Sequence, residues 1–156
     1  MPARCLVWPA GRRFIEGITL RLFCYGTLQF PEIMERVCGL HASGVPAMLD
    51  NHDCFTVRGE VYPGIVPRSG AQTPGMVYSG LGMAQLQKLD AFESDCYERR
   101  RVMVCDVRER SLEAWVYVMR EGLDGLLSDE RWNRELFRRI YLKGFLQRLG
   151  GGGSGT

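Results

Sequence analysis

The amino-acid sequence predicts one mixed α+β domain, built as a small, mixed and mostly antiparallel β-barrel flanked by two or three helices. About six short β-prone segments occur with two or three helical ones, without the regular alternation of a doubly wound sheet. The chain has 156 residues, the usual length of one domain. Its 46% of hydrophobic residues is enough to form a core.

The first predicted unit is a strand, a loop and a helix. Residues 20–25 are apolar and β-prone and end at Gly26, as expected for a buried strand that enters a tight loop. Pro31 suits the first position of a helix, which Gly39 would end. A loop between a strand and a helix offers backbone N–H groups without partners, and these suit a carboxylate or an oxyanion. Residues 25–30 are therefore a candidate binding site, although a purely structural turn is the alternative.

The middle of the chain is predicted to contain short strands and one helix. Four β-prone pieces are separated by Gly and Pro, and they cover residues 47–49, 54–57, 62–66 and 75–78. From Met83 to Phe92 an apolar residue recurs every three positions, which predicts a helix with Glu93 at its end.

The last third of the domain is predicted to form a hairpin and a final helix. Residues 97–107 and 112–118 are β-rich and flank a charged turn. Ser128 is expected to cap the helix. The apolar stripe of this helix is expected to consist of Trp132, Leu136, Ile140 and Tyr141. The predicted boundaries are an N-terminal arm at 1–19, the domain at 20–149 and a flexible Gly-rich tail at 150–156.

Composition argues against several functional classes. A formal charge of +2 is too small for a typical nucleic-acid-binding protein. Neither His41 nor His52 has the spacing of a metal site, and no cofactor is expected. No apolar run reaches the ~18 residues of a membrane span. Six cysteines without a Cys-x-x-Cys pair or a secretory segment indicate reduced thiols in a cytoplasmic protein.

Glu93 is the candidate for proton transfer. Burial beside Phe92 would raise its pKa and let it both accept and donate a proton near neutral pH. The alternative is an ordinary solvated helix end. Tyr62, Tyr97 and Tyr117 could line a pocket, although β-rich segments favour tyrosine for packing alone.

The chain from about residue 20 to residue 141 resembles the AIG2-like branch of the γ-glutamylcyclotransferase family. Four runs carry the likeness: Phe23-Cys24-Tyr25-Gly26-Thr27-Leu28-Gln29-Phe30-Pro31, Val61-Tyr62-Pro63-Gly64-Ile65-Val66-Pro67, Leu89-Asp90-Ala91-Phe92-Glu93-Ser94-Asp95-Cys96-Tyr97-Glu98-Arg99-Arg100 and Glu113-Ala114-Trp115-Val116-Tyr117-Val118. The first and third runs are the specific ones. The resemblance implies the fold of that family, a small mixed β-barrel with flanking helices.

The resemblance also implies an activity, a γ-glutamylcyclotransferase-like acyl transfer. The α-amine of a γ-glutamyl group would attack its own side-chain carbonyl, releasing an amine and 5-oxoproline without a cofactor. The backbone of Tyr25, Gly26, Thr27, Leu28, Gln29 and Phe30 would bind the small-molecule substrate, and Glu93 would be the catalytic acid and base. The loop reads Tyr-Gly-Thr-Leu where the glutathione and γ-glutamyl-dipeptide enzymes have Tyr-Gly-Ser-Asn-Leu, so the substrate does not carry over.

Two other functions fit the same sequence. A binding module could keep the pocket for a γ-glutamyl metabolite without turning it over. An interaction protein could instead use the Arg-rich last helix, with salt-dependent affinity for an acidic partner.

Overall fold

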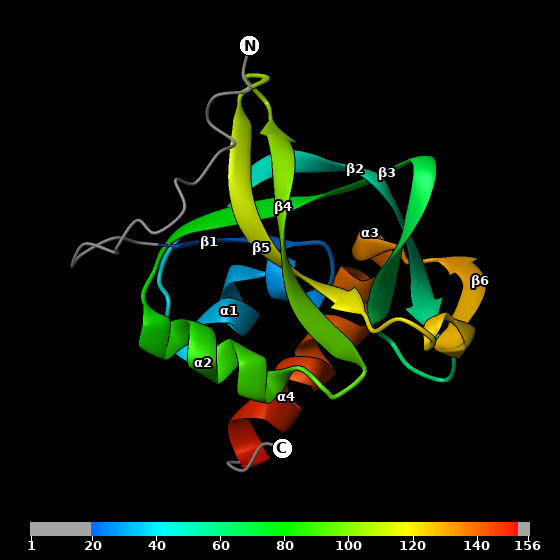
Figure 1. The fold of residues 1–156 in the computed structure, drawn as a ribbon. Helices are drawn as coiled ribbons and strands as arrows, with labels where there is room; N and C mark the ends of the chain where they lie inside the picture. The colour runs from blue at the N-terminus through cyan, green and yellow to red at the C-terminus, as the bar shows by residue number, and fades with distance from the viewer. Residues whose placement is uncertain (1–19, 153–156) are drawn as a thin grey trace.

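The computed structural model of the protein describes residues 20–152, which form a barrel with helices gathered on one side (Figure 1). The expected arm at 1–19 and residues 153–156 of the expected tail lie outside the described residues. No helix within residues 20–152 is long and apolar enough to cross a membrane.

Six strands form one sheet. They are β1 (Leu20–Cys24), β2 (Val45–Val57), β3 (Pro63–Leu81), β4 (Tyr97–Asp106), β5 (Ser111–Met119) and β6 (Leu127–Arg131). Their order is β3-β1-β5-β4-β2-β6, and an additional pairing of β2 with β3 closes the first five strands into a barrel. Strand β1 runs parallel to β5, and the remaining pairs are antiparallel. The predicted fold class is therefore confirmed.

Strands β2 and β3 are longer than the sequence predicted. The expected pieces 47–49 and 54–57 belong to one strand, and 62–66 and 75–78 belong to the next. Asn51, with φ of 60°, lies where the register shifts, and its side-chain oxygen accepts a hydrogen bond of 3.0 Å from the Gly70 N–H. Both strands therefore continue through this shift in register, and the prediction of separate short strands was wrong.

Helices α1 (Pro31–Cys38) and α2 (Met83–Phe92) have the bounds that the sequence predicted. Gly39 ends α1 in the left-handed region, with φ of 79°, a conformation that favours glycine. A short 3-10 turn, η2 (Thr27–Gln29), lies between β1 and α1, and another, η3 (Asp124–Leu126), precedes β6. Glu93 is the C-cap residue of α2, as expected.

The C-terminal helix differs from its prediction. It consists of α3 (Arg134–Leu136), a π-helical turn η4 (Phe137–Tyr141) and α4 (Leu142–Gly152), so it also includes the start of the expected tail at 150–156. Ser128 lies in β6, and Asn133 caps the helix instead, its side chain accepting a hydrogen bond from the Leu136 N–H.

The predicted apolar stripe was wrong for Leu136, Ile140 and Tyr141, which are exposed, whereas Trp132, just before the helix, packs against the core. Ile140 is 59% exposed, whereas Phe137 is 2% exposed and packs against Phe30 with ring centroids 5.5 Å apart. The later helix start and the wider π turn rotate the buried face away from the positions that regular helical spacing gives. Phe137 therefore anchors the helix.

The two faces of β1 belong to two hydrophobic clusters. Leu22 and Cys24 join the cluster between barrel and helices, whereas Phe23 and Tyr25 join the cluster inside the barrel. This alternation is the one expected for a strand buried on both faces. The loop that follows Cys24 consequently starts at the junction between the two clusters.

Gly75 of β3 should be essential for this arrangement. A Cβ atom there would lie 2.3 Å from the Cys24 carbonyl oxygen and 2.7 Å from the Phe23 ring, so β1 would have to move. We expect Gly75→Ala to lower the free energy of unfolding by about 3 kcal/mol, the upper end of the range for overpacking.

Urea unfolding measures this effect, with Gly125→Ala as the control. A Cβ at Gly125 meets no atom within 4 Å, so that variant should unfold like the wild type. Equal stability of the two variants would contradict the tight approach of β1 to β3.

Candidate functional site

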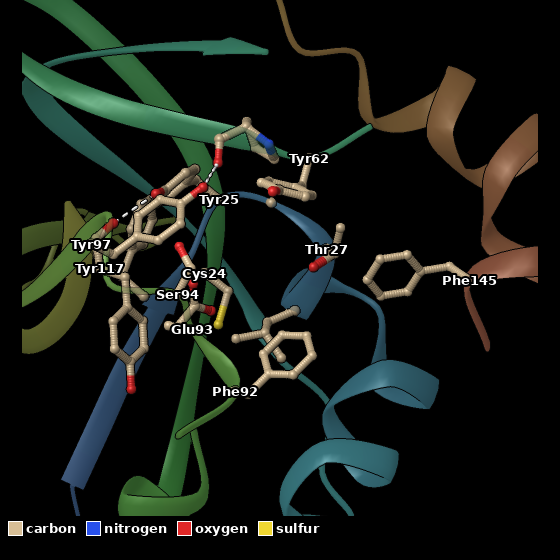
Figure 2. A pocket seen from close by; sticks show the side chains of 14 residues that line it. Cys24, Tyr25, Thr27, Tyr62, Phe92, Glu93, Ser94, Tyr97, Tyr117 and Phe145 are labelled. Atoms are coloured by element: carbon tan, nitrogen blue, oxygen red, sulfur yellow. Dashed lines mark hydrogen bonds between the residues drawn. The ribbon is translucent and has the colours of Figure 1, made fainter. Parts of the chain in front are cut away.

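One cavity collects most of the residues that the sequence singled out. Its volume is about 240 Å³, close to the lower end of the roughly 300–1,000 Å³ usual for small-molecule sites. It is lined by Phe23, Cys24, Tyr25, Gly26, Thr27, Leu28, Tyr62, Pro63, Phe92, Glu93, Ser94, Tyr97, Tyr117 and Phe145 (Figure 2). The end of β1, the end of α2 and strands β4 and β5 thus meet around a space suited to a small ligand.

The loop after β1 forms one wall with residues 25–28. A Cβ atom at Gly26 would lie 2.8 Å from the Pro63 ring, so glycine is needed here for close packing of the protein chain itself. Within residues 20–152, the backbone N–H groups of Thr27 and Leu28 have no hydrogen-bond acceptor. These two N–H groups begin η2, where such groups are left without a partner, and they are available to an anionic ligand group.

Gln29 and Phe30, also predicted to bind substrate, do not line the cavity. The N–H of Gln29 donates to the Gly26 carbonyl at 3.0 Å, and that of Phe30 donates to the Thr27 carbonyl at 3.2 Å. The Gln29 side chain donates to the Tyr25 carbonyl at 2.7 Å. The geometry therefore assigns these two residues to holding the loop, because their donors are already engaged.

Glu93 projects into the cavity from the end of α2 (Figure 2). Its N–H donates to the Leu89 carbonyl at 3.0 Å, which completes the helix and fixes its backbone. Its carboxylate has no hydrogen bond or ion pair with another described residue. Burial raises the pKa of Glu93 from its usual 4.5 to about 8, and the negative charge of Asp90 adds to this rise.

Asp90, one helical turn earlier, is in a very different environment. Arg99 binds both of its carboxylate oxygens, at 2.8 and 3.0 Å, and the Tyr117 hydroxyl donates to it at 2.7 Å. Partial burial opposes ionisation, but the Arg99 and Tyr117 hydrogen bonds outweigh it and lower the pKa of Asp90. Asp90 therefore stays ionised, while Glu93 can exchange a proton near neutral pH.

Three of the tyrosine hydroxyls around the cavity are engaged by the protein. Tyr25 donates to the Tyr117 carbonyl at 2.6 Å and Tyr97 to the Pro63 carbonyl at 2.7 Å, as Figure 2 shows. The phenol of Tyr117 points away from the cavity toward Asp90. Tyr62 differs, because its hydroxyl has no partner among residues 20–152, and burial raises its pKa. Tyr62 is thus the tyrosine best placed to donate to a ligand.

Cys24 also lines the cavity, near Glu93. Burial, reinforced by the carboxyl group of Glu93, raises the pKa of the Cys24 thiol well above its usual value. The thiol therefore stays protonated, and protonated thiols are poor nucleophiles. Within the described residues no three His, Cys, Asp or Glu side chains converge as a metal site would require.

Sequence reasoning missed some cavity residues. Phe145 comes from α4, and Ser94 adds a hydroxyl beside Glu93. Ser94 could have been inferred from its position next to Glu93. Phe145 gave no such signal, because the π turn displaces the buried face of its helix from the predicted one.

Comparisons with known proteins identify the family of this chain. The family described as γ-glutamyl cyclotransferase, AIG2-like, matches residues 22–134. AIG2-like protein C of Arabidopsis thaliana is 34% identical over 120 residues, which cover 76% of this chain and 69% of that protein. The family resemblance expected from the sequence is therefore confirmed.

Solved structures show the same fold. A solution structure of an Arabidopsis thaliana protein aligns with a TM-score of 0.68 at 24% identity, covering 89% of this chain and 84% of that one. A γ-glutamyl cyclotransferase aligns with a TM-score of 0.57 at 15% identity, covering 85% of this chain and 87% of that one. At these identities the likeness concerns the fold alone.

The unusual pKa of Glu93 should be visible in the pH dependence of stability. With a folded-state pKa of about 8 against the usual 4.5, folded Glu93 keeps a proton that the unfolded chain releases between these values. Protonated Glu93 therefore makes its full contribution to the free energy of unfolding below a pH of 4.5. This contribution is lost as the pH rises from 4.5 to about 8. The slope is at most about 1.4 kcal/mol per pH unit.

Comparison with Glu93→Gln isolates this contribution, because glutamine does not titrate and the other groups cancel. Urea unfolding from about pH 5 to about pH 8 should show the variant gaining stability relative to the wild type as the pH rises. A stability difference that is independent of pH would mean that the Glu93 carboxylate is solvated.

Proposed function

The chain belongs to the AIG2-like γ-glutamyl cyclotransferase family, and on that premise we propose that it is an enzyme that cyclises a γ-glutamyl compound. The substrate is a γ-glutamyl amine, amide or short peptide, and the products are 5-oxoproline and the free amine. The observation that carries the proposal is the Glu93 carboxyl group, which is desolvated, without a protein partner and has a pKa of about 8.

The reaction is an acyl transfer to an internal amine. The α-nitrogen of the γ-glutamyl group attacks the side-chain carbonyl carbon, a new C–N bond closes the five-membered ring, and the bond to the leaving amine breaks. Two protons leave the attacking nitrogen, and the leaving nitrogen gains two. Because nucleophile and electrophile are in one molecule, the protein mainly has to hold the substrate folded back on itself.

Glu93 is suited to carry these protons. An α-ammonium group has a reference pKa of about 7.7–8.0, close to the value of about 8 for Glu93. A proton can therefore move between the two groups with little change in free energy. Glu93 takes a proton from the α-ammonium group, which frees the nucleophile, and then delivers it to the leaving nitrogen.

The loop at 25–28 supplies the opposite wall. The unpartnered N–H groups of Thr27 and Leu28 suit either the α-carboxylate of the substrate or the oxygen that becomes negative in the tetrahedral intermediate. Hydrogen bonds from Gln29 to Tyr25 and from Tyr25 to Tyr117 hold this wall in place before substrate arrives. A preorganised loop of this kind lowers the barrier without a cofactor.

We place this activity in the cytoplasm. Five described cysteines are free thiols, namely Cys24, Cys38, Cys54, Cys96 and Cys105. Free thiols at these positions fit a reducing compartment, where small γ-glutamyl metabolites would be the substrates.

Replacement of Glu93 should abolish turnover without abolishing the pocket. We expect Glu93→Gln to lower the rate of 5-oxoproline release by about 10²- to 10⁴-fold, the usual contribution of a general acid and base. The assay is 5-oxoproline release from a panel of γ-glutamyl amines, amides and dipeptides.

Asp95→Asn is the matched control, because Asp95 is an exposed carboxylate two positions away that does not line the cavity. It should retain the wild-type rate. If the wild type releases no product but γ-glutamyl compounds still raise its melting temperature, the protein is a binding module and not an enzyme. If neither turnover nor binding is seen, the pocket has no γ-glutamyl ligand, and an interaction role for the Arg-rich helix becomes the leading account.

A further inference from the structure

A second cavity of about 460 Å³ adjoins the one that contains Glu93. Among the described residues, Tyr25 is the only one that lines both cavities. Most of the second cavity comes from β3 around Gly75 and from the residues that join β6 to the C-terminal helix. Its volume is within the roughly 300–1,000 Å³ usual for small-molecule sites, so it has room for a small ligand.

Arg131 lines this cavity from the end of β6 and is fixed by a buried carboxylate. Its guanidinium donates to both oxygens of Asp53, whose side chain is 1% exposed. The guanidinium of Arg68 lies 3.2 Å from the same carboxylate. Two cations therefore share one anion, and the three side chains together keep a net positive charge.

Arg134 is a second cation on the cavity wall, and it has no carboxylate partner within residues 20–152. Its guanidinium lies over the Phe30 ring, 4.8 Å from the centroid, and this contact holds the side chain without engaging its N–H donors. The neighbouring Glu135 binds Arg138 instead. Arg134 therefore presents a positioned charge whose N–H donors are available to a ligand.

Acidic groups near this cavity do not replace such a ligand. None of the described residues that line it is Asp or Glu. Asp50 accepts a hydrogen bond of 2.8 Å from the lining residue Gln72. Burial raises the pKa of Tyr78, and the nearby Glu32 and Arg134 act on it in opposite directions, so Glu32 is also in this region. Both carboxylates are exposed, so water and salt screen them, whereas a bound anion would contact the guanidinium groups directly.

Trp132 adds an apolar surface beside the two arginines. Its indole N–H donates to the Val61 carbonyl at 2.8 Å, and its ring packs on Phe137 with centroids 5.6 Å apart, so the ring is held in place. Met76 and Pro74 of β3 complete the apolar part of the lining. A cavity with guanidinium groups on one part of its wall and an apolar surface on another suits an anion with an apolar body.

We propose that this cavity is a second ligand site, which binds a small organic carboxylate. The guanidinium groups of Arg131 and Arg134 bind the carboxylate, and the apolar part of the ligand packs on Trp132. Guanidinium groups match the planar geometry of a carboxylate and its two acceptor oxygens. The site goes beyond the chemistry proposed for Glu93, so its occupancy is measured by binding and does not depend on turnover.

Three probes test the ligand class by titration calorimetry: 3-phenylpropionate, its neutral amide 3-phenylpropanamide, and inorganic phosphate. We expect 3-phenylpropionate to bind about 10-fold or more tightly than the amide, because the amide forms no charge-assisted hydrogen bonds to arginine. It should also bind more tightly than phosphate, which has no apolar part to pack on Trp132. Equal binding of the acid and the amide, or phosphate that binds as well as the acid, would overturn the proposed class.

The place of binding is tested by NMR of the tryptophan indole N–H groups. The Trp132 signal, identified by its loss in Trp132→Phe, should shift when 3-phenylpropionate is added. The Trp115 signal should not shift, because Trp115 lines neither cavity. A Trp132 signal that stays unchanged at saturating 3-phenylpropionate would place the ligand elsewhere and contradict the proposal.

Arg134→Gln should weaken 3-phenylpropionate binding about 10-fold or more, the usual effect of losing a hydrogen bond between charged groups. Arg139→Gln is the matched control, since Arg139 is exposed in the same helix and does not line the cavity, and it should bind like the wild type. Undiminished binding by Arg134→Gln would mean that the anion occupies another place, such as the loop N–H groups of the Glu93 cavity, and would refute the second site. Absence of binding to the wild type would refute it as well.

Discussion

The parallel pairing of β1 with β5, with Leu22 opposite Trp115, is the constraint on which the site depends. It inserts β1 between β3 and β5 and completes the barrel. Strand β1 therefore ends beside β5, where the Tyr25 hydroxyl reaches the Tyr117 carbonyl. Helix α2 follows β3, the other neighbour of β1, so its last turn brings Glu93 to the same end of the barrel.

Within this frame, two carboxylates three residues apart are given opposite environments. Arg99 and Tyr117 stabilise the charge of Asp90, while the cavity gives Glu93 neither a cation nor a hydrogen bond from a described residue. The ionised Asp90 also disfavours a second negative charge nearby, so it helps to keep Glu93 protonated. Asp90, held ionised by Arg99, thus helps to raise the pKa of Glu93, the group that we propose for proton transfer.

The sequence was sufficient for features that depend on local patterns. Apolar spacing located α1 and α2, and the end of α2 located Glu93, because helical periodicity directly reflects which face is buried. The sequence failed at β2 and β3, where the register shifts beside Asn51 without ending either strand. It also failed in the C-terminal helix, where a π turn broke the regular spacing and hid Phe145. Partners such as Arg99 for Asp90 depend on the pairing of distant elements, which a single sequence does not contain.

The most direct test of the central claim is the titration of the Glu93 side-chain carboxyl group by carbon-detected NMR on the folded protein. A midpoint at a pH of about 8 would show that the cavity holds a carboxyl group able to exchange protons with an α-amine. A midpoint near the usual 4.5 would mean that Glu93 is a solvated helix end, and it would contradict the account of both the site and the reaction.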